Sequence, residues 1–277
     1  MTKEAYFIGA GNVELYENRS ICDSEPLANV ILLHGFGDHC SRYAWVMEQF
    51  RQADINVFTY DQRGHGHSPG KRAYVERFED FLDDLDAFRK HIAPDITTAP
   101  VFIMGHSMGG MVLARYAQTR DLQEIRGLVF SSPFLAFTEE TPAFLIALGP
   151  YVAKVLPWLP VGSVDNTGLS RDPAIEEIAN QDPLAFHGKV AAKTGAEFTR
   201  MIRAIEKDAS KIVKSMLVIH GTHDRIVSPS GSEMLHEKAS AKDKTLRMYD
   251  GGYHELYNDL DKEQFMAEVI TWIKARV

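Results

Sequence analysis

A serine with a glycine two residues away on each side is the first group in this chain that could do chemistry. Ser107 stands in the segment Gly105-His106-Ser107-Met108-Gly109-Gly110, after an apolar run at 101–104 and before a helix-compatible stretch at 108–119. A turn from strand to helix within two residues strains the serine backbone, and the glycines keep neighbouring Cβ atoms from colliding. The turn lifts the hydroxyl clear of the sheet, close to the free N–H groups at the helix start. We therefore expect Ser107 to be a nucleophile.

A nucleophilic serine needs an adjacent base, and the base needs an acid that orients it. In a strand–turn–helix setting the three groups follow the chain order serine, acid, histidine. Asp224 lies just past the apolar run 216–219 and is our candidate acid. Asp250 is the rival, but it stands close before His254 and is better explained as a turn former.

His254 is our candidate base among eleven histidines. It follows the strand-like run 245–249 and precedes a helix-like segment, so its loop can reach back over the serine. His220 precedes the acid and is therefore out of order, and His236 falls in an expected surface helix. We expect His254 to accept the serine proton and return it to the leaving group, while Asp224 stabilises the imidazolium.

Strand-like and helix-like segments alternate along most of the chain. The expected strands are 5–8, 12–16, 30–33, 56–60, 101–104, 127–131, 216–219 and 245–249, and the expected helices are 42–53, 78–92, 108–119, 230–239 and 262–275. Alternation with continuous Val/Ile/Leu strands predicts an α/β fold with a mostly parallel sheet covered on both faces. The first two strands have no helix between them, so we expect them to form an antiparallel edge.

Residues 133–210 break this alternation, because they contain no clear strand. A loop of that length inside a compact domain has its own structure or a function. The segment is apolar on several sides and is punctuated by prolines. We therefore interpret 133–210 as a helical cap inserted into a core formed by 1–132 and 211–277.

Composition excludes several classes of partner. A net charge of −8 argues against nucleic acid. No apolar run is long enough to span a bilayer, and residues 1–5 lack the pattern of a secretory signal. Cys22 and Cys40 have no metal-ligand spacing, so we expect free thiols in a reducing, cytoplasmic compartment.

Several stretches together resemble the α/β-hydrolase superfamily, and within it the monoacylglycerol lipase/lysophospholipase group. Besides the segment around Ser107, they are His34-Gly35-Phe36-Gly37-Asp38-His39-Cys40-Ser41-Arg42-Tyr43, Asp61-Gln62-Arg63-Gly64-His65-Gly66-His67-Ser68, Asp182-Pro183-Leu184, His220-Gly221-Thr222-His223-Asp224-Arg225-Ile226-Val227 and Gly251-Gly252-Tyr253-His254-Glu255. The resemblance implies the α/β-hydrolase fold and cleavage of carboxylic esters through an acyl-enzyme. One departure is Ala179, which stands where some members of the group carry an aromatic residue near the alcohol site.

The acyl-transfer reaction also needs two N–H donors for the oxyanion. We expect them to be the backbone of Met108, directly after the nucleophile, and of Phe36, in the loop after the strand 30–33. His65 and His67 suggest a metal pair, but no third ligand is evident and the glycine-rich turn explains them better. We expect neither a metal nor a cofactor.

The expected substrate is a small acyl ester, a monoacylglycerol or a similar single-chain ester. The cap residues that could line an acyl tunnel are apolar: Phe144, Leu145, Ile146, Leu148, Val155, Leu156, Trp158 and Leu159. We also expect the cap to touch membranes transiently. Two alternatives are a serine aminopeptidase or amidase, for which Glu139, Glu140, Glu176 and Glu177 offer cap carboxylates, and a non-catalytic binding protein of the same fold.

Overall fold

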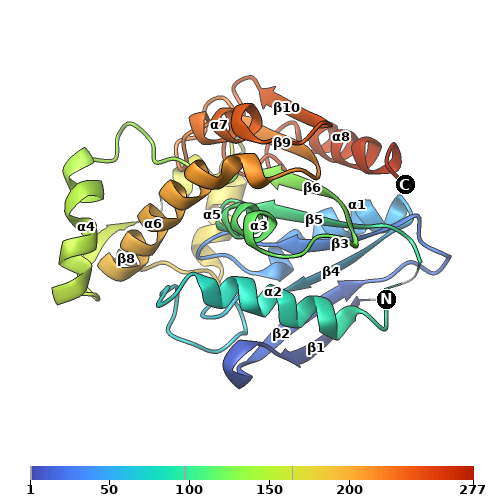
Figure 1. Cartoon of the computed structure of the whole chain (residues 1–277), viewed down its shortest axis with the longest axis horizontal. Coiled ribbons are helices and arrows are strands. Elements are labelled where there is room, and N and C mark those ends of the chain that lie inside the picture. The colour runs from blue at the N-terminus through green and yellow to red at the C-terminus, as the bar shows by residue number, and fades with distance from the viewer. Residues whose placement is uncertain (1, 97, 164) are drawn as a thin grey trace.

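An eight-stranded sheet forms the centre of the molecule (Figure 1). The computed structural model describes residues 2–96, 98–163 and 165–277, without the side chains of residues 2–4 and 145. The strands are β1 (Thr2–Ile8), β2 (Glu14–Ser20), β3 (Ala28–Leu33), β4 (Ile55–Tyr60), β5 (Val101–His106), β6 (Ile125–Ser131), β9 (Ser215–Gly221) and β10 (Lys244–Tyr249). Their spatial order is β1-β2-β4-β3-β5-β6-β9-β10. The expected α/β fold is confirmed.

The sheet is parallel except at one edge. β1 pairs antiparallel with β2, and β2 pairs antiparallel with β4, whereas the strands from β4 to β10 run parallel. We expected an antiparallel edge because no helix was predicted between the first two strands, and this edge is present. Because parallel strands end at one edge of the sheet, the loops after β3, β5, β6, β9 and β10 open on the same side.

Helices cover both faces of the sheet. The helices outside the segment between β6 and β9 are α1 (Ala44–Gln52), α2 (Glu79–Ile92), α3 (Met108–Thr119), α7 (Ser230–Lys238) and α8 (Lys262–Lys274). Successive residues of β3 point to opposite faces: Ile31 packs with α2 and α3, whereas Leu32 packs with α1 and α8. This double burial explains why the central strands are continuous apolar runs.

The segment between β6 and β9 differs from expectation, because it contains two short strands. Its elements are α4 (Ala143–Val155), β7 (Pro160–Ser163), α5 (Pro173–Gln181), β8 (Lys189–Ala191) and α6 (Ala192–Asp208). β7 and β8 form an antiparallel pair with an irregular register. Neither strand is predictable from its pattern, since β7 has one apolar β-branched residue between a proline and a glycine.

The same segment is only partly separate from the sheet. α4 extends away from the sheet, at the left of Figure 1, beside the first half of α6. α6 packs against α3 as well, and its Phe198, Met201 and Ile205 belong to the main hydrophobic core. Among the described residues, no helix is both long and apolar enough to cross a membrane.

Candidate active site

Ser107 occupies the turn between β5 and α3 with a left-handed backbone, φ 52° and ψ −116°. A positive φ is strained for a non-glycine residue and persists only where its surroundings enforce it. Here the Ser107 N–H donates to the Ser131 carbonyl at 3.1 Å, and its carbonyl accepts from Met111 and Phe134 at 3.0 Å each. The serine backbone is thus held by Ser131 of β6, by Met111 of α3 and by Phe134 in the segment after β6.

The glycines around Ser107 are required by close backbone approach. A Cβ on Gly105 would lie 2.4 Å from the Gly109 carbonyl oxygen, and one on Gly109 would lie 2.3 Å from that of Leu33. The start of α3 therefore sits directly against the end of β3. As a result, the loop after β3 reaches Ser107: a Cβ on Gly35 would lie 3.3 Å from Ser107 Cβ.

Asp224 lies just after β9 and is held by hydrogen bonds to both carboxylate oxygens. Oδ2 accepts from Nδ1 of His254 at 2.6 Å, and Oδ1 accepts from the backbone N–H of Ile226 at 2.8 Å and of Val227 at 3.0 Å. Burial alone would raise the pKa of this carboxyl, but the charges and hydrogen bonds of two nearby histidines, His254 and His220, hold it well below its ordinary value. Asp224 is therefore an ionised, oriented acceptor.

His254 is buried beside the turn that carries Ser107. Its ring lies 4.7 Å, centre to centre, from that of His106, the residue directly before Ser107. Since Nδ1 is bonded to Asp224, Nε2 is the nitrogen left to accept a serine proton. Burial lowers the pKa of His254, but the Asp224 charge and hydrogen bond outweigh it, so the pKa is raised overall.

Ion pairs join the loops that surround the serine. Arg42 makes two hydrogen bonds of 2.9 Å to Glu255, the residue after His254, and contacts Asp38 in the loop after β3 at 3.3 Å. His39, next in that loop, bonds through Nε2 to Asp182 at the end of α5 at 2.8 Å. The Asp182-Pro183-Leu184 segment is thereby tied to the loop after β3.

The structure also contains a partner of Asp224 that sequence reasoning missed. Nε2 of His220 lies 3.0 Å from Asp224 Oδ2, and His220 is fully buried. Chain order excludes this histidine as the base, because it precedes the acid, and says nothing of a contact with the acid itself. Its position at the end of a buried strand, four residues before the acid, is the signal that could have found it.

Three further candidates from the sequence are the two expected oxyanion donors, Met108 and Phe36, and the rival acid, Asp250. Met108 is fully buried at the start of α3, and the ring of Phe36 packs edge-on against those of Phe198 and His65 at 5.4 and 5.6 Å. Asp250, the rival acid, is exposed and contacts Thr222 at 3.5 Å. The geometry thus brings Asp224, not Asp250, to His254.

His65 and Cys40 are both buried side chains. Nδ1 of His65 lies 3.0 Å from the Arg63 carbonyl, and burial lowers the pKa of His65 to about 3. Cys40 is buried, and its backbone N–H donates to Asp61; burial raises the pKa of its thiol. In the part of the chain that the structure describes, no three His, Cys, Asp or Glu residues are arranged to hold a metal ion.

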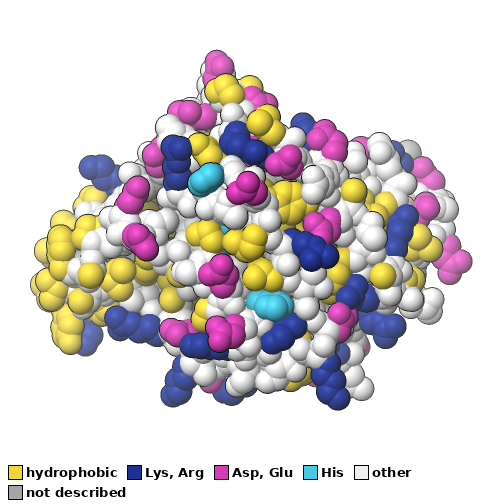
Figure 2. All heavy atoms as spheres, turned by 90° about the horizontal axis from the view of Figure 1, so that it is seen from above, with side chains coloured by type: hydrophobic (Ala, Val, Ile, Leu, Met, Phe, Trp, Pro, Cys, Tyr) yellow, Lys and Arg dark blue, Asp and Glu magenta, His cyan; other side chains and the backbone are white. Residues whose placement is uncertain are grey.

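The cap residues proposed to line an acyl tunnel are mostly turned to solvent. More than a third of the surface is exposed for Phe144, Leu148, Val155, Leu156, Trp158 and Leu159, while Ile146 is half-buried. Leu145 belongs to α4, and its side chain lies outside the described residues. Figure 2 shows hydrophobic side chains gathered at the end of the molecule where α4 lies.

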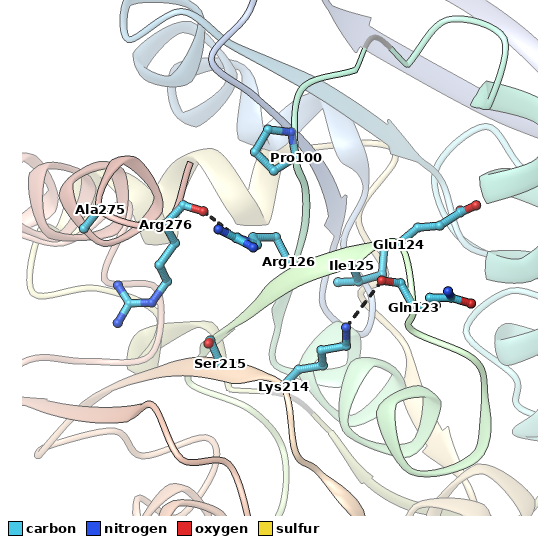
Figure 3. A pocket seen from close by; sticks show the side chains of 9 residues that line it. All are labelled: Pro100, Gln123, Glu124, Ile125, Arg126, Lys214, Ser215, Ala275 and Arg276. Carbon is cyan, nitrogen blue, oxygen red and sulfur yellow. Dashed lines mark hydrogen bonds between the residues drawn. The ribbon is translucent and has the colours of Figure 1, made fainter.

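A hollow of about 460 Å³ lies at the opposite edge of the sheet, at the amino ends of β5, β6 and β9. Figure 3 shows its two cationic contacts: Arg126 donates to the Arg276 carbonyl and Lys214 to the Gln123 carbonyl. These cations satisfy backbone oxygens. The candidate site is therefore the one at the carboxyl ends of the strands, around Ser107.

Comparison with known proteins agrees with this fold. Residues 24–261 match the family model described as "Serine aminopeptidase, S33". The chain is 31% identical to the monoacylglycerol lipase of Mycolicibacterium smegmatis, over 98% of this chain and 96% of that protein. It is 32% identical to the human monoglyceride lipase, over 91% and 84% of the two chains. The crystal structure of the Paleococcus ferrophilus monoacylglycerol lipase superposes with a TM-score of 0.85 and 32% identity, covering 95% of this chain and 99% of that one.

The chain therefore belongs to the serine hydrolases of the α/β-hydrolase superfamily, in the group that contains the monoacylglycerol lipases. The resemblance inferred from its motifs is confirmed.

Proposed function

We propose that this enzyme hydrolyses monoacylglycerols through an acyl-enzyme on Ser107, with His254 as base and Asp224 as its orienting acid. The observation that carries the proposal is the 2.6 Å hydrogen bond from His254 Nδ1 to Asp224 Oδ2. These two residues are thirty positions apart in the sequence. The loops after β9 and β10 bring them to the edge of the sheet at which β5 ends and Ser107 follows.

The first half of the reaction acylates the serine. Neutral His254 takes the Ser107 proton on Nε2 as Oγ attacks the ester carbonyl, and Asp224 stabilises the imidazolium that forms. The carbonyl oxygen becomes an oxyanion, for which the backbone N–H groups of Phe36 and Met108 are the proposed donors. The imidazolium then returns its proton to the alcohol, glycerol, which leaves as the C–O bond breaks.

The second half releases the fatty acid. A water molecule gives its proton to Nε2 of His254 and attacks the acyl carbonyl, with the same two N–H donors stabilising the oxyanion. Collapse of this intermediate breaks the Ser107 Oγ–acyl bond, and His254 returns the proton to Oγ. Each half begins with neutral His254, so protonation of this ring in the free enzyme stops turnover.

We further propose that residues 133–210 act as a cap that collects the lipid substrate from a membrane surface. The exposed apolar side chains support this: Tyr151, Val155 and Trp158 are 68%, 75% and 65% exposed. A net charge of −8 gives no general attraction to anionic lipid, so contact would rest on apolar burial.

The cap proposal is tested with vesicles. Replacing Val155 and Trp158 together by serine is expected to weaken binding to phosphatidylcholine vesicles and to slow turnover of long-chain esters, while a short, water-soluble ester is spared. Leu260→Ser removes a leucine outside the cap that is 63% exposed and is the control. Equal loss on short and long esters would refute the proposal for these two residues.

The substrate class is tested with a panel of glyceryl esters of increasing acyl length beside aminoacyl arylamides. We expect the glyceryl esters to have the higher kcat/KM. The family description names a serine aminopeptidase, and preference for the arylamides would assign that activity instead. Ser107→Ala, assayed on both substrates, shows that the turnover comes from this site.

A further inference from the structure

The carboxylate of Asp224 has two histidine donors on a single oxygen. His220 places Nε2 at 3.0 Å and His254 places Nδ1 at 2.6 Å from the same Oδ2. On its far side, Nδ1 of His220 lies 2.6 Å from the hydroxyl of Ser232 in α7. His220 and Ser232 are both 0% exposed, so bulk water does not compete for these bonds.

Donor and acceptor chemistry fixes the hydrogen on the side of His220 that faces Asp224. An ionised carboxylate only accepts, so Nε2 of His220 carries its hydrogen. On the other side of the ring, Nδ1 and the Ser232 hydroxyl share the 2.6 Å hydrogen bond. The ring of His220 is therefore held in one orientation by two partners, Asp224 in the loop after β9 and Ser232 in α7.

We propose that His220 is a positioning residue for the candidate acid, and that Ser232 in turn orients His220. The inference rests on the proposed function, because it acts through Asp224 and His254 and not on the substrate. The amides of Ile226 and Val227 fix Oδ1 alone. The N–H of His220 fixes the second oxygen, Oδ2. It thereby fixes the plane of the carboxylate to which His254 is hydrogen-bonded.

This role has a consequence for the charge of the pair. The hydrogen bond from the His220 N–H partly offsets the negative charge of Asp224. Without this hydrogen bond, the carboxylate interacts more strongly with the protonated ring of His254. The pKa of His254 should then rise further, and the acidic limb of the kcat/KM profile should move to higher pH. The other ionisable groups that face His254 and its neighbour His106 are Asp38, Glu255 and Arg42. They stay the same in every variant.

The test uses two isosteres of the histidine. His220→Gln keeps an amide N–H near the Nε2 position, whereas His220→Asn keeps one near Nδ1 and leaves Asp224 without this donor. We expect His220→Asn to lower kcat about tenfold or more, to leave KM nearly unchanged and to move the acidic limb to higher pH. His220→Gln should recover most of the kcat and the wild-type limb. Ser232→Ala, a smaller change, should move both quantities in the direction of His220→Asn.

Two controls separate this inference from the proposed function. His236→Gln, on the same helix as Ser232, should leave the profile unchanged. If Ser107→Ala is inactive while both His220 variants keep the wild-type kcat and acidic limb, the positioning role is wrong and the proposed function stands. If His220→Gln and His220→Asn lose kcat equally and the acidic limb does not move, His220 contributes only to packing. This result would also refute the positioning role. Turnover by Ser107→Ala would overturn the proposed function and this inference with it.

Discussion

Arg42 and Glu255 form a bidentate ion pair across the active site, with both hydrogen bonds 2.9 Å long. Their side chains are only 10% and 3% exposed. Glu255 directly follows His254, and Arg42 also contacts Asp38, two residues after Phe36. The pair therefore joins the loop of the candidate base to the loop of one proposed oxyanion donor.

Breaking this pair should cost stability. Glu255→Gln leaves Arg42 with a buried charge that Asp38 compensates only in part, so we expect a loss of about 3 kcal/mol in the free energy of unfolding. Arg276 and Asp243 form an equally bidentate pair, but Asp243 is half exposed. Asp243→Asn should therefore cost less than about 1 kcal/mol. Urea denaturation of both variants measures the difference, and equal losses would contradict the role given to burial.

Asparagine substitutions should rank the two candidate acids. Asp224→Asn removes the charge and favours the wrong tautomer of His254, so kcat should fall by about 10⁴ with little change in KM. Asp250→Asn alters an exposed side chain and should change kcat by less than about twofold. Steady-state kinetics on one glyceryl ester decides the ranking, and the reverse order would assign the acid to Asp250.

The pH profile should report His254. Burial lowers its pKa, but the Asp224 charge and hydrogen bond raise it to a net value above the ordinary 6.5. Because the neutral ring is the active form, kcat/KM should fall as the pH drops through this pKa. The acidic limb should thus have its midpoint above pH 6.5. A midpoint clearly below that value would mean that Asp224 does not stabilise the imidazolium.

The turn before Ser107 should not tolerate a side chain. A Cβ on Gly105 would lie 2.4 Å from the Gly109 carbonyl, so Gly105→Ala must push α3 away from β5. We expect a loss of at least about 2 kcal/mol in unfolding free energy. Gly162, in the exposed strand β7, has nothing within 4 Å of its Cβ position. Gly162→Ala should therefore stay within about 0.5 kcal/mol of wild type by thermal denaturation.

The sheet was predictable from sequence because both of its faces are buried. Each of the eight expected runs lies within or overlaps an observed strand, and α3 spans the expected residues, Met108–Thr119. The strain at Ser107 was predictable from the glycine spacing together with the change from strand to helix around the serine. These features depend on local chain chemistry, which a sequence displays directly.

Contacts between distant segments were less predictable. The two-stranded β7–β8 pair joins residues with weak strand patterns, and the packing of α6 on α3 depends on how the inserted segment returns to the core. The hydrogen bond of His220 to Asp224 was missed because chain order ranks candidate bases and is silent about which residues hold the acid. The roles of Ser107, Asp224 and His254 stay predictions.

The central claim is that Ser107 carries the acyl group. Intact-protein and peptide mass spectrometry after treatment with a fluorophosphonate, or with a slowly hydrolysed acyl ester, locates the modified residue. We predict a single adduct on the peptide containing Ser107, and neither an adduct nor ester turnover in Ser107→Ala, whose fold should match the wild type by circular dichroism. An adduct on another residue, or labelling of Ser107→Ala at the wild-type rate, would contradict the claim.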